Sequence, residues 1–392
     1  MVKLTGYIEL VCETDKEGQK EFLVIFSGRK TKTFTVNELI YNFLQHFESP
    51  TTLNEVIERF KEKVITTSQQ ESDALKKHLT FFYEDLVNKK WIVSEDKLEQ
   101  TIQRITLHNV GDVFLDYKIL SVLGNEMNTD VYLVKDLNAR TNRVIKLLNR
   151  NKFSSEKSFK KYREHFCQEY AFLERFNSKL INGGLTFKDY KSHSFMVLKW
   201  VNGISISKFI KLNRLSSVQK IALVLKILKG FAILHQNKVY HGDIHFSNIL
   251  VSKKLQPTII DFGYANEAYE SSKTKQKPRN GGVFKFIPPE RAIRSLVRRF
   301  KEVTQFQSEV YQIGLIIYFV FCKELPFQAE TWKVMVDEKR NFDIDAHDSF
   351  GKRRMPKAVR KFISMSLQTS PDDRFDSAVE MRDAWQTLSN NY

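Results

Sequence analysis

The chain has 392 residues, which is enough for two or three domains of roughly 100–200 residues each. Its hydrophobic fraction of 42%, its charged fraction of 28% and its 15 glycines and 8 prolines exclude a disordered, collagenous or fibrous protein. The three widely spaced cysteines exclude a disulfide framework and a paired-cysteine zinc site, and they favour a cytoplasmic protein. No segment has the length and apolar character of a signal sequence or a membrane span.

The net charge of +16 is unevenly distributed along the chain. Residues 1–100 hold 14 Lys and Arg against 17 Asp and Glu, whereas residues 101–392 hold 48 against 29. The basic excess of the later part favours an anionic partner such as a nucleotide or an acidic peptide, or it serves only solubility. Because an acidic domain repels phosphates, we do not expect nucleic acid to bind the first hundred residues.

Residues 1–95 are predicted to form a small α+β domain in which strands precede three helices. Strands are expected at 7–12, 21–26 and 32–36, helices at 37–47, from Thr52 and at 72–86, and a closing extended piece at 91–93. The first helix is predicted from apolar residues three and four positions apart, and Thr52 with Glu55 makes a capping box for the second helix.

This order of elements resembles the PqqD-like peptide-recognition modules, which are winged-helix domains that bind the leader segments of ribosomally made peptides. The resemblance implies that a leader peptide adds a strand to the sheet edge of residues 1–95. Two alternatives remain, namely a winged helix that only packs on the rest of the chain and, less favoured, one that reads DNA.

Residues 96–112 are polar and are expected to be a linker. From residue 113 strand-like runs are followed by mostly helical patterns, which predicts a two-lobed α+β body over 113–392. The boundary between the lobes is expected between residues 198 and 203.

The densest chemical signal lies at residues 240–250 (YHGDIHFSNIL) and 259–265 (IIDFGYA). Asn248 follows Asp243 by five residues, and Asp261 follows Asn248 by thirteen. A carboxylate beside an acceptor hydroxyl, with an amide and a second carboxylate as oxygen ligands for hard cations, suits phosphoryl transfer from a nucleotide. The two strings and their spacing resemble the catalytic loop and the magnesium-binding DFG motif of protein kinases.

The resemblance implies ATP and Mg²⁺ as cofactors and gives roles to the polar residues of these motifs. Asp243 would orient the acceptor hydroxyl and take its proton, while Asn248 and Asp261 would hold the metal ions. Lys146, on the strand-like run RVIKLL, would contact the α- and β-phosphates.

The lysine requires a glutamate partner from the helix predicted over 159–176, which offers Glu164 and Glu169. Glu169 is favoured because Leu173 and Phe176 follow it at helical spacing, so that it faces the core side with them.

The kinase resemblance also assigns residues around the nucleotide. Leu198 would lie behind the adenine, and Lys199, Trp200 and Val201 would present backbone groups to its edge. Gly124 would belong to the loop that covers the phosphates (LGNEMNTDVYLV, 123–134).

Later motifs appear in the order of the kinase family. Pro288-Pro289-Glu290 resembles the end of an activation segment, and Arg374 in SPDDR resembles the arginine that pairs with its glutamate. Glu309 stands where the anchoring helix usually has aspartate.

Three departures limit the resemblance. Glu126 and Thr129 occupy glycine positions of the phosphate-covering loop, Gly242 replaces the arginine of the HRD triplet, and His245 replaces the usual lysine. Without that arginine, we do not expect a switch by activation-loop phosphorylation. His245, which could donate to the γ-phosphate, is also typical of small-molecule kinases that resemble aminoglycoside phosphotransferases.

The sequence therefore predicts an ATP-dependent kinase that phosphorylates Ser or Thr of a peptide or protein. A ribosomally made precursor peptide captured by residues 1–95 is the favoured substrate, with lyase or cyclase partners acting later. The alternatives are a small-molecule phosphotransferase, a pseudokinase binding module, and a relative of the RIO kinases, which lack the Pro289-Glu290 and DFG motifs.

Overall fold

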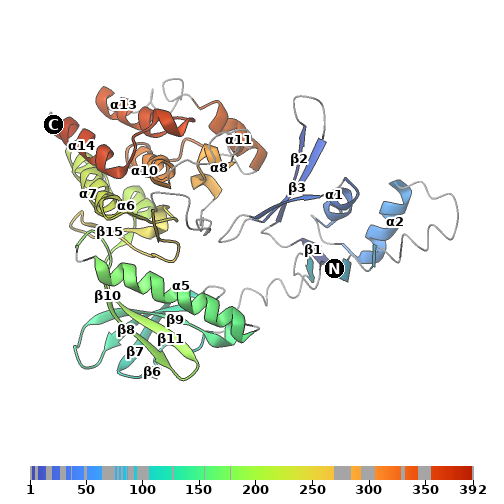
Figure 1. The fold of residues 1–392 in the computed structure, drawn as a ribbon, viewed down its shortest axis with the longest axis horizontal. Coiled ribbons are helices and arrows are strands. Elements are labelled where there is room, and N and C mark those ends of the chain that lie inside the picture. Colours follow the sequence, from blue (N-terminus) through green and yellow to red (C-terminus); the bar gives the residue numbers. More distant parts are fainter. Residues whose placement is uncertain are drawn as a thin grey trace. The chain divides into compact units, whose positions relative to one another are not determined.

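The structure is a computed structural model that divides into two compact units, Met1–Ile105 with Thr331–Lys333, and Thr106–Glu330 with Val334–Tyr392. It describes residues 2–4, 8–14, 20–26, 32–36, 38–47, 51–63, six positions between 76 and 86, 92–94, 106–125, 128–153, 155–176, 178–268, 284–292, 305–327, 332–342 and 355–390. Each unit begins with strands, and further strands follow its first helices in the chain (Figure 1).

The first unit contains two small antiparallel sheets. One sheet has the order β2 (Ile8–Thr14), β3 (Lys20–Phe26), β4 (Lys32–Val36), and the other pairs β1 (Val2–Leu4) with β5 (Ile92–Ser94). In the first sheet the register runs from the Ile8–Phe26 pair to the Thr14–Lys20 pair, so β2 and β3 form a hairpin. Strands β2 and β4 are the edges of this sheet among the described residues.

The helices of the first unit bury several of the apolar residues that the sequence predicts for their inner faces. They are α1 (Glu38–Gln45), α2 (Leu53–Lys63) and the described positions between 76 and 86, which are helical. The amide of Glu55 donates to Thr52 Oγ1 and the amide of Thr52 donates to Glu55 Oε2, so the predicted capping box is formed. Phe43, Leu44 and Val56 are buried. The winged-helix assignment of this unit stays a prediction.

The second unit begins with a six-stranded antiparallel sheet in the order β10-β11-β9-β8-β7-β6. Its strands are β6 (Val113–Phe114), β7 (Tyr117–Asn125), β8 (Thr129–Asp136), β9 (Asn142–Leu148), β10 (Gly184–Tyr190) and β11 (His193–Lys199). Helix α5 (Glu156–Arg175) is capped by Ser155 and lies between this sheet and the helical lobe (Figure 1).

The rest of the second unit is a mostly helical lobe. Its helices are α6 (Ile206–Leu212), α7 (Ser217–Gln236), α8 (Pro289–Ala292), α10 (Gln305–Cys322), α11 (Trp332–Arg340), α13 (Lys357–Ser366) and α14 (Ala378–Ser389). Short strands carry the loops of the site, namely β12 (Ile204–Ser205), β13 (Val239–Tyr240), β14 (Ile249–Val251), β15 (Pro257–Ile259) and β16 (Asn266–Glu267).

One hydrophobic core joins the two lobes of the second unit. It contains Met196 and Leu198 of β11, Leu173 of α5 and most of α10. The apolar run Ile313–Cys322 is buried in this core, as expected for an internal helix. Among the helices that the structure describes, none is long and apolar enough to cross a membrane.

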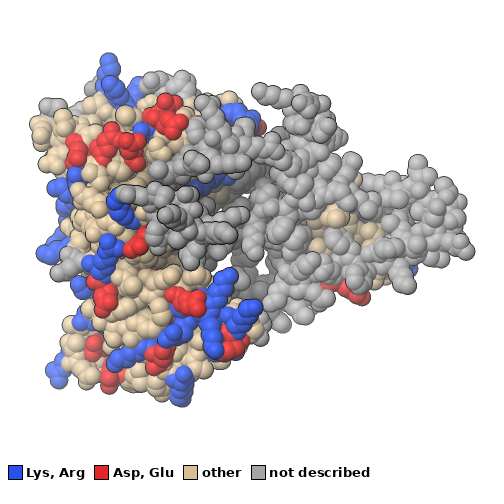
Figure 2. All heavy atoms as spheres, viewed as in Figure 1, with Lys and Arg blue, Asp and Glu red and all other residues tan. Residues whose placement is uncertain are grey.

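The second unit starts earlier than the sequence indicates. Residues 106–112, expected as part of the linker, pack on the strand-rich lobe, because Leu107 contacts its small core and the amide of Ile119 donates to Asp112 O at 2.8 Å. On the face seen in Figure 2, Lys and Arg of the described residues lie among Asp and Glu rather than in one basic field.

Candidate active site

Lys146 and two carboxylates form the centre of the candidate active site. The Lys146 side chain is 9% exposed, and its Nζ donates to Glu169 Oε1 at 2.6 Å and to Asp261 Oδ1 at 2.8 Å. Burial lowers the pKa of Lys146, but the charges of Asp261 and Glu169 outweigh burial and raise it above its ordinary value. The structure thus holds a permanent cation between two acids. Glu164 lies on the exposed side of the same helix.

Asp261 is held in an uncommon backbone conformation. Its φ of 63° is left-handed, which is unfavourable for a residue other than glycine, and such strain is concentrated at functional sites. The amide of Gly263 donates to Asp261 Oδ1 at 3.4 Å, and a Cβ on Gly263 would lie 3.3 Å from the same oxygen. Phe262 between them is buried, with its ring centroid 5.1 Å from that of His241. The DFG segment is therefore fixed against the catalytic loop.

The catalytic loop brings Asp243 and Asn248 together. Asn248 lies at the end of a short 3₁₀ turn (Phe246–Asn248) and its Nδ2 donates to the backbone oxygen of Asp243 at 2.9 Å. The amide of Ile260 donates to Asn248 O at 2.9 Å, and His241 Nε2 lies 3.0 Å from Ile260 O. The loop and the strand that leads to Asp261 are thus joined by hydrogen bonds on both sides.

His245 belongs to the same loop and caps its 3₁₀ turn. Its Nδ1 accepts from the amide of Ser247 at 3.2 Å, while its Nε2 lies 3.1 Å from Asn248 Nδ2 and 3.6 Å from Asp243 Oδ2. The two neighbours of Nε2 make opposite demands on it, because the Asn248 amide group is a donor and the Asp243 carboxylate is an acceptor. His245 therefore lies between the two polar side chains of the loop, Asp243 and Asn248.

Gly242 occupies a position that only glycine fits. Its φ is +79°, and a Cβ there would lie 2.3 Å from the backbone oxygen of Tyr264. Its amide donates to Glu309 Oε1 at 2.6 Å, while Glu309 Oε2 lies 2.9 Å from His235 Nε2. The glutamate of α10 thereby anchors the catalytic loop to α7, and Gly242 lets the segment after Gly263 approach that loop.

The predicted nucleotide-contacting residues lie on β7 and at the end of β11 and just after it. Leu198 is buried at the end of β11, the amide of Lys199 donates to Gly183 O, and Val201 O accepts from the amide of Gly203. A Cβ on Gly124 would make only ordinary contacts, 3.7 Å from Val131, so no neighbour in the described chain requires glycine at that position. Trp200 is half-buried, and Glu126 lies outside the described residues.

Helix α8 is tied to the turn before α14 by a buried ion pair. Arg374 donates to both oxygens of Glu290, at 3.2 and 2.8 Å, and Ser308 Oγ donates to Glu290 Oε1 at 2.6 Å. Burial raises the pKa of Glu290, but Arg374 outweighs it and lowers the pKa below its ordinary range. The Arg374 guanidinium also donates to the carbonyls of Gln307, Gln368 and Thr369. Three chain segments, at Glu290, at residues 307–308 and at residues 368–374, thus meet at one buried cation.

Comparison with known families decides what this arrangement is. Residues 117–386 match the protein kinase domain. The chain belongs to the protein kinase family. The matched domain is that of a phosphotransferase, and the predicted two-lobed kinase fold is confirmed for this part of the chain.

The relatives of the kinase domain include bacterial enzymes. The probable serine/threonine-protein kinase PknB of Lactococcus lactis is 25% identical over 225 residues, which cover 57% of this chain and 34% of the relative. The serine/threonine-protein kinase PrkC of Bacillus subtilis is 23% identical over 269 residues, which cover 68% of this chain and 39% of the relative. PknH of Mycobacterium tuberculosis is 22% identical over 273 residues, 69% of this chain and 42% of the relative. The chain thus spans well under half the length of these relatives.

Sequence reasoning missed two buried charged groups of the kinase domain. Asp130 is fully buried on β8, and Lys339 is 1% exposed on α11. A signal existed for Asp130, because it alternates with Tyr132 and Val134 on a strand whose face they share. No local pattern marked Lys339, whose Nζ donates to the backbone oxygens of Lys285 and Ile287 far upstream in the chain.

Proposed function

We propose that this kinase transfers the terminal phosphoryl group of ATP to a Ser or Thr hydroxyl of a peptide or protein. The observation that carries the proposal is the buried Lys146, held at 2.6 Å by Glu169 and at 2.8 Å by Asp261. A lysine on a strand without such carboxylate partners would not indicate phosphoryl transfer. Here the cation lies beside the carboxylate that the kinase resemblance gives to a metal ion, and the catalytic loop is bonded to the strand before that carboxylate.

The donor set fits a magnesium-bound nucleotide. Asn248 donates through Nδ2 to Asp243 O, so its Oδ1 remains the atom suited to a hard cation, and Asp261 supplies carboxylate oxygens. Mg²⁺ usually takes one or two protein oxygens and completes its shell with waters and phosphate oxygens. Magnesium with ATP would supply the activated phosphoryl group and neutralise its charge.

The residues of the chain would do the positioning. Asp243 receives the proton of the acceptor hydroxyl and orients that hydroxyl toward the phosphoryl group. Lys146 holds the phosphates, and His245 lies beside Asp243, with its Nε2 3.6 Å from Asp243 Oδ2. Fixing these groups before reaction removes much of the entropic and electrostatic cost of the transition state.

A protein acceptor is favoured over a small molecule by the tether between Glu290 and Arg374. This pair fixes the segment that resembles the substrate-docking part of protein kinases, and small-molecule phosphotransferases generally lack that segment. Of the basic residues that follow Glu290 in the chain, Arg291 donates to the side chain of Gln305, while Arg294, Arg298 and Arg299 lie outside the described residues.

Phosphotransfer is tested with γ-labelled ATP, Mg²⁺ and Ser- or Thr-containing peptides. The wild type should label the peptide, and Asp243→Asn should reduce the rate by at least about a hundredfold, the scale of a general-base contribution. Lys157→Met is the matched control, because Lys157 is an exposed lysine on the first turn of α5. Equal label transfer by wild type and Asp243→Asn, or no transfer by either, would contradict the proposal.

For the first unit, we propose capture of a ribosomally made precursor peptide. Support comes from the order of its elements and from the strand edges β2 and β4, to which an extended peptide could add. The synthetic leader segment should compete with the full precursor and raise its KM, without changing turnover of a short peptide that lacks the leader. Competition against both peptides, or against neither, would refute capture by this unit.

A further inference from the structure

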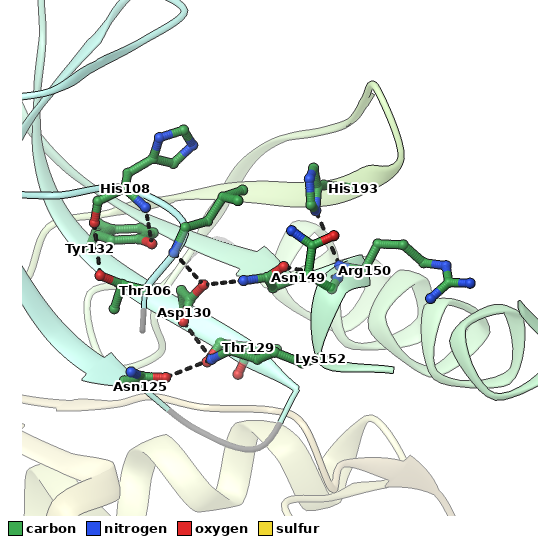
Figure 3. A network of polar contacts seen from close by, with 12 residues as sticks. Thr106, His108, Asn125, Thr129, Asp130, Tyr132, Asn149, Arg150, Lys152 and His193 are labelled. Carbon is green, nitrogen blue, oxygen red and sulfur yellow. Dashed lines mark hydrogen bonds and ion pairs between the residues drawn. The ribbon is translucent and has the colours of Figure 1, made fainter. Parts of the chain in front are cut away.

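A buried polar network lies on the face of the sheet opposite Lys146. Asp130 pairs with Leu147 across β8 and β9, whereas Val131 pairs with Lys146. Because side chains alternate along a strand, Asp130 points to the face that carries Tyr132 and Leu147, away from the Lys146 side chain. Asp130 can therefore affect the reaction only indirectly, through the groups that it holds in place (Figure 3).

Both oxygens of Asp130 accept hydrogen bonds. Oδ2 accepts from Asn149 Nδ2 at 2.8 Å and from the amide of Leu107 at 3.3 Å, while Oδ1 accepts from Lys152 Nζ at 2.5 Å. Asp130 is 0% exposed, so this carboxylate is buried only because these donors are in place. Leu107 lies upstream of the residues that match the kinase family, so the chain uses its own leading segment to complete the network.

Lys152 extends the network to both limbs of the phosphate-covering loop. Its Nζ donates to Asn125 Oδ1 at 2.6 Å on the incoming limb and to Thr129 O at 3.3 Å on the outgoing limb. The backbone adds another link, because the amide of Asn149 donates to Asn128 O at 3.0 Å. Figure 3 shows Lys152 reaching from the connection between β9 and α5 to these positions.

The geometry points to Lys152 and Asp130 as a latch that positions the phosphate-covering loop, an inference that rests on the proposed use of ATP. Where kinases usually have glycine, this loop has Thr129, whose Cβ hinders close approach of backbone to phosphate. The ammonium of Lys152 offers three donors, and Asn125, Thr129 and Asp130 supply three acceptors for them. Bonds made on the outer face keep the loop amides ordered before the nucleotide arrives, which lowers the entropic cost of binding.

Lys152 and Asp130 are therefore positioning residues, and their loss should act on nucleotide affinity rather than on chemistry. In Lys152→Met the KM for ATP should rise about tenfold, with kcat within about twofold, the effect of losing one charge-assisted anchor. Lys152→Arg should recover most of the affinity, and Lys157→Met should match wild type. Adding Asp130→Asn to Lys152→Met should raise the KM little further, because the two residues act as one unit.

Hydrogen–deuterium exchange of the nucleotide-free protein gives a second readout. Residues 123–131 should exchange faster in Lys152→Met than in wild type, while the peptide that contains Asp243 keeps its wild-type rate. If the wild type proved inactive toward ATP, the proposed function would fail and this exchange measurement would still test the latch. An unchanged exchange rate in residues 123–131, or equal falls in kcat and kcat/KM with an unchanged KM, would overturn the inference.

Discussion

Replacing Gly242 by alanine tests how closely the catalytic loop is fitted to the segment that follows the DFG motif. The new Cβ would lie 2.3 Å from Tyr264 O and 3.0 Å from Tyr264 C, both backbone atoms, so relief requires movement of the chain. The φ of +79° adds the cost of a left-handed conformation. Strain of about 1–2 kcal/mol and overpacking of about 1–3 kcal/mol together destabilise the kinase domain by about 2–5 kcal/mol.

The same substitution should also reduce the rate of phosphorylation, by more than the loss of folded protein explains. The amide of Gly242 is bonded to Glu309 at 2.6 Å, and Asp243 is its neighbour, so any backbone movement that clears Tyr264 also moves Asp243, the proposed general base. A misplacement of about 1 Å can cost about a hundredfold in rate. Restoring arginine with Gly242→Arg should therefore inactivate the enzyme rather than add a phosphorylation switch.

Thermal unfolding and initial rates of peptide phosphorylation measure both effects. The unfolding midpoint should fall by about 4–15 °C, from about 2–3 °C per kcal/mol for a domain of this size. Gly111→Ala is the matched control, because Gly111 has a φ of +97° and a Cβ there would meet no atom of the described chain within 4 Å, so this variant isolates the backbone strain. If Gly242→Ala behaved like Gly111→Ala in both assays, the contact with Tyr264 would not matter and the reasoning would be refuted.

Two further predictions concern buried charges. Arg374→Lys loses the bidentate hydrogen bond to Glu290 and should lower the free energy of unfolding by about 3–5 kcal/mol. It should also raise the KM for peptide but not the KM for ATP. An unchanged peptide KM would contradict the docking role of this tether. Burial lowers the pKa of Lys339 to about 7 from 10.5, although Glu290 raises it and Arg374 lowers it further. Between pH 7 and 10.5 the unfolded chain then binds more protons than the folded one, so the free energy of unfolding of the wild type should rise by about 2 kcal/mol from pH 7 to pH 9. Lys339→Met should lack this gain. If the free energy of unfolding of both proteins changed in parallel with pH, the prediction would be wrong.

Local patterns in the sequence were sufficient for most elements and for the central lysine pair. The helical spacing of Glu169 and Leu173 predicts that they share a face, and in the structure both are buried on α5 while Glu164 is exposed. Amphipathic spacing likewise places Phe43 and Val56 in the core of the first unit. Such predictions succeed because the periodicity of a helix or strand alone decides which side chains turn inward.

Contacts between distant segments could not be predicted in this way. Asp130 and Lys152 meet across 22 residues, and Gly242 and Glu309 across 67. Neither separation in the sequence matches the period of a helix or strand, so no local pattern predicts these contacts. The need for glycine at position 242 is explained only by the backbone oxygen of Tyr264 beside it. The packing of residues 106–112 on the sheet was hidden for the same reason, because it depends on partners elsewhere in the chain, such as Asp130, which accepts from the amide of Leu107.

Three departures from the usual kinase pattern, Gly242, His245 and Glu309, lie in one connected arrangement around the catalytic loop, and this bears on whether the site is active. Glu309 is longer than the usual aspartate and reaches both His235 and the amide of Gly242. His245 caps the turn that ends in Asn248. In a site that had lost its chemistry, unrelated substitutions would leave buried polar groups without partners, at a cost of about 1–3 kcal/mol each. Here Gly242, His245 and Glu309 all take part in hydrogen bonds that hold the loop of Asp243 and Asn248 in place, which argues for a working phosphotransferase rather than a pseudokinase.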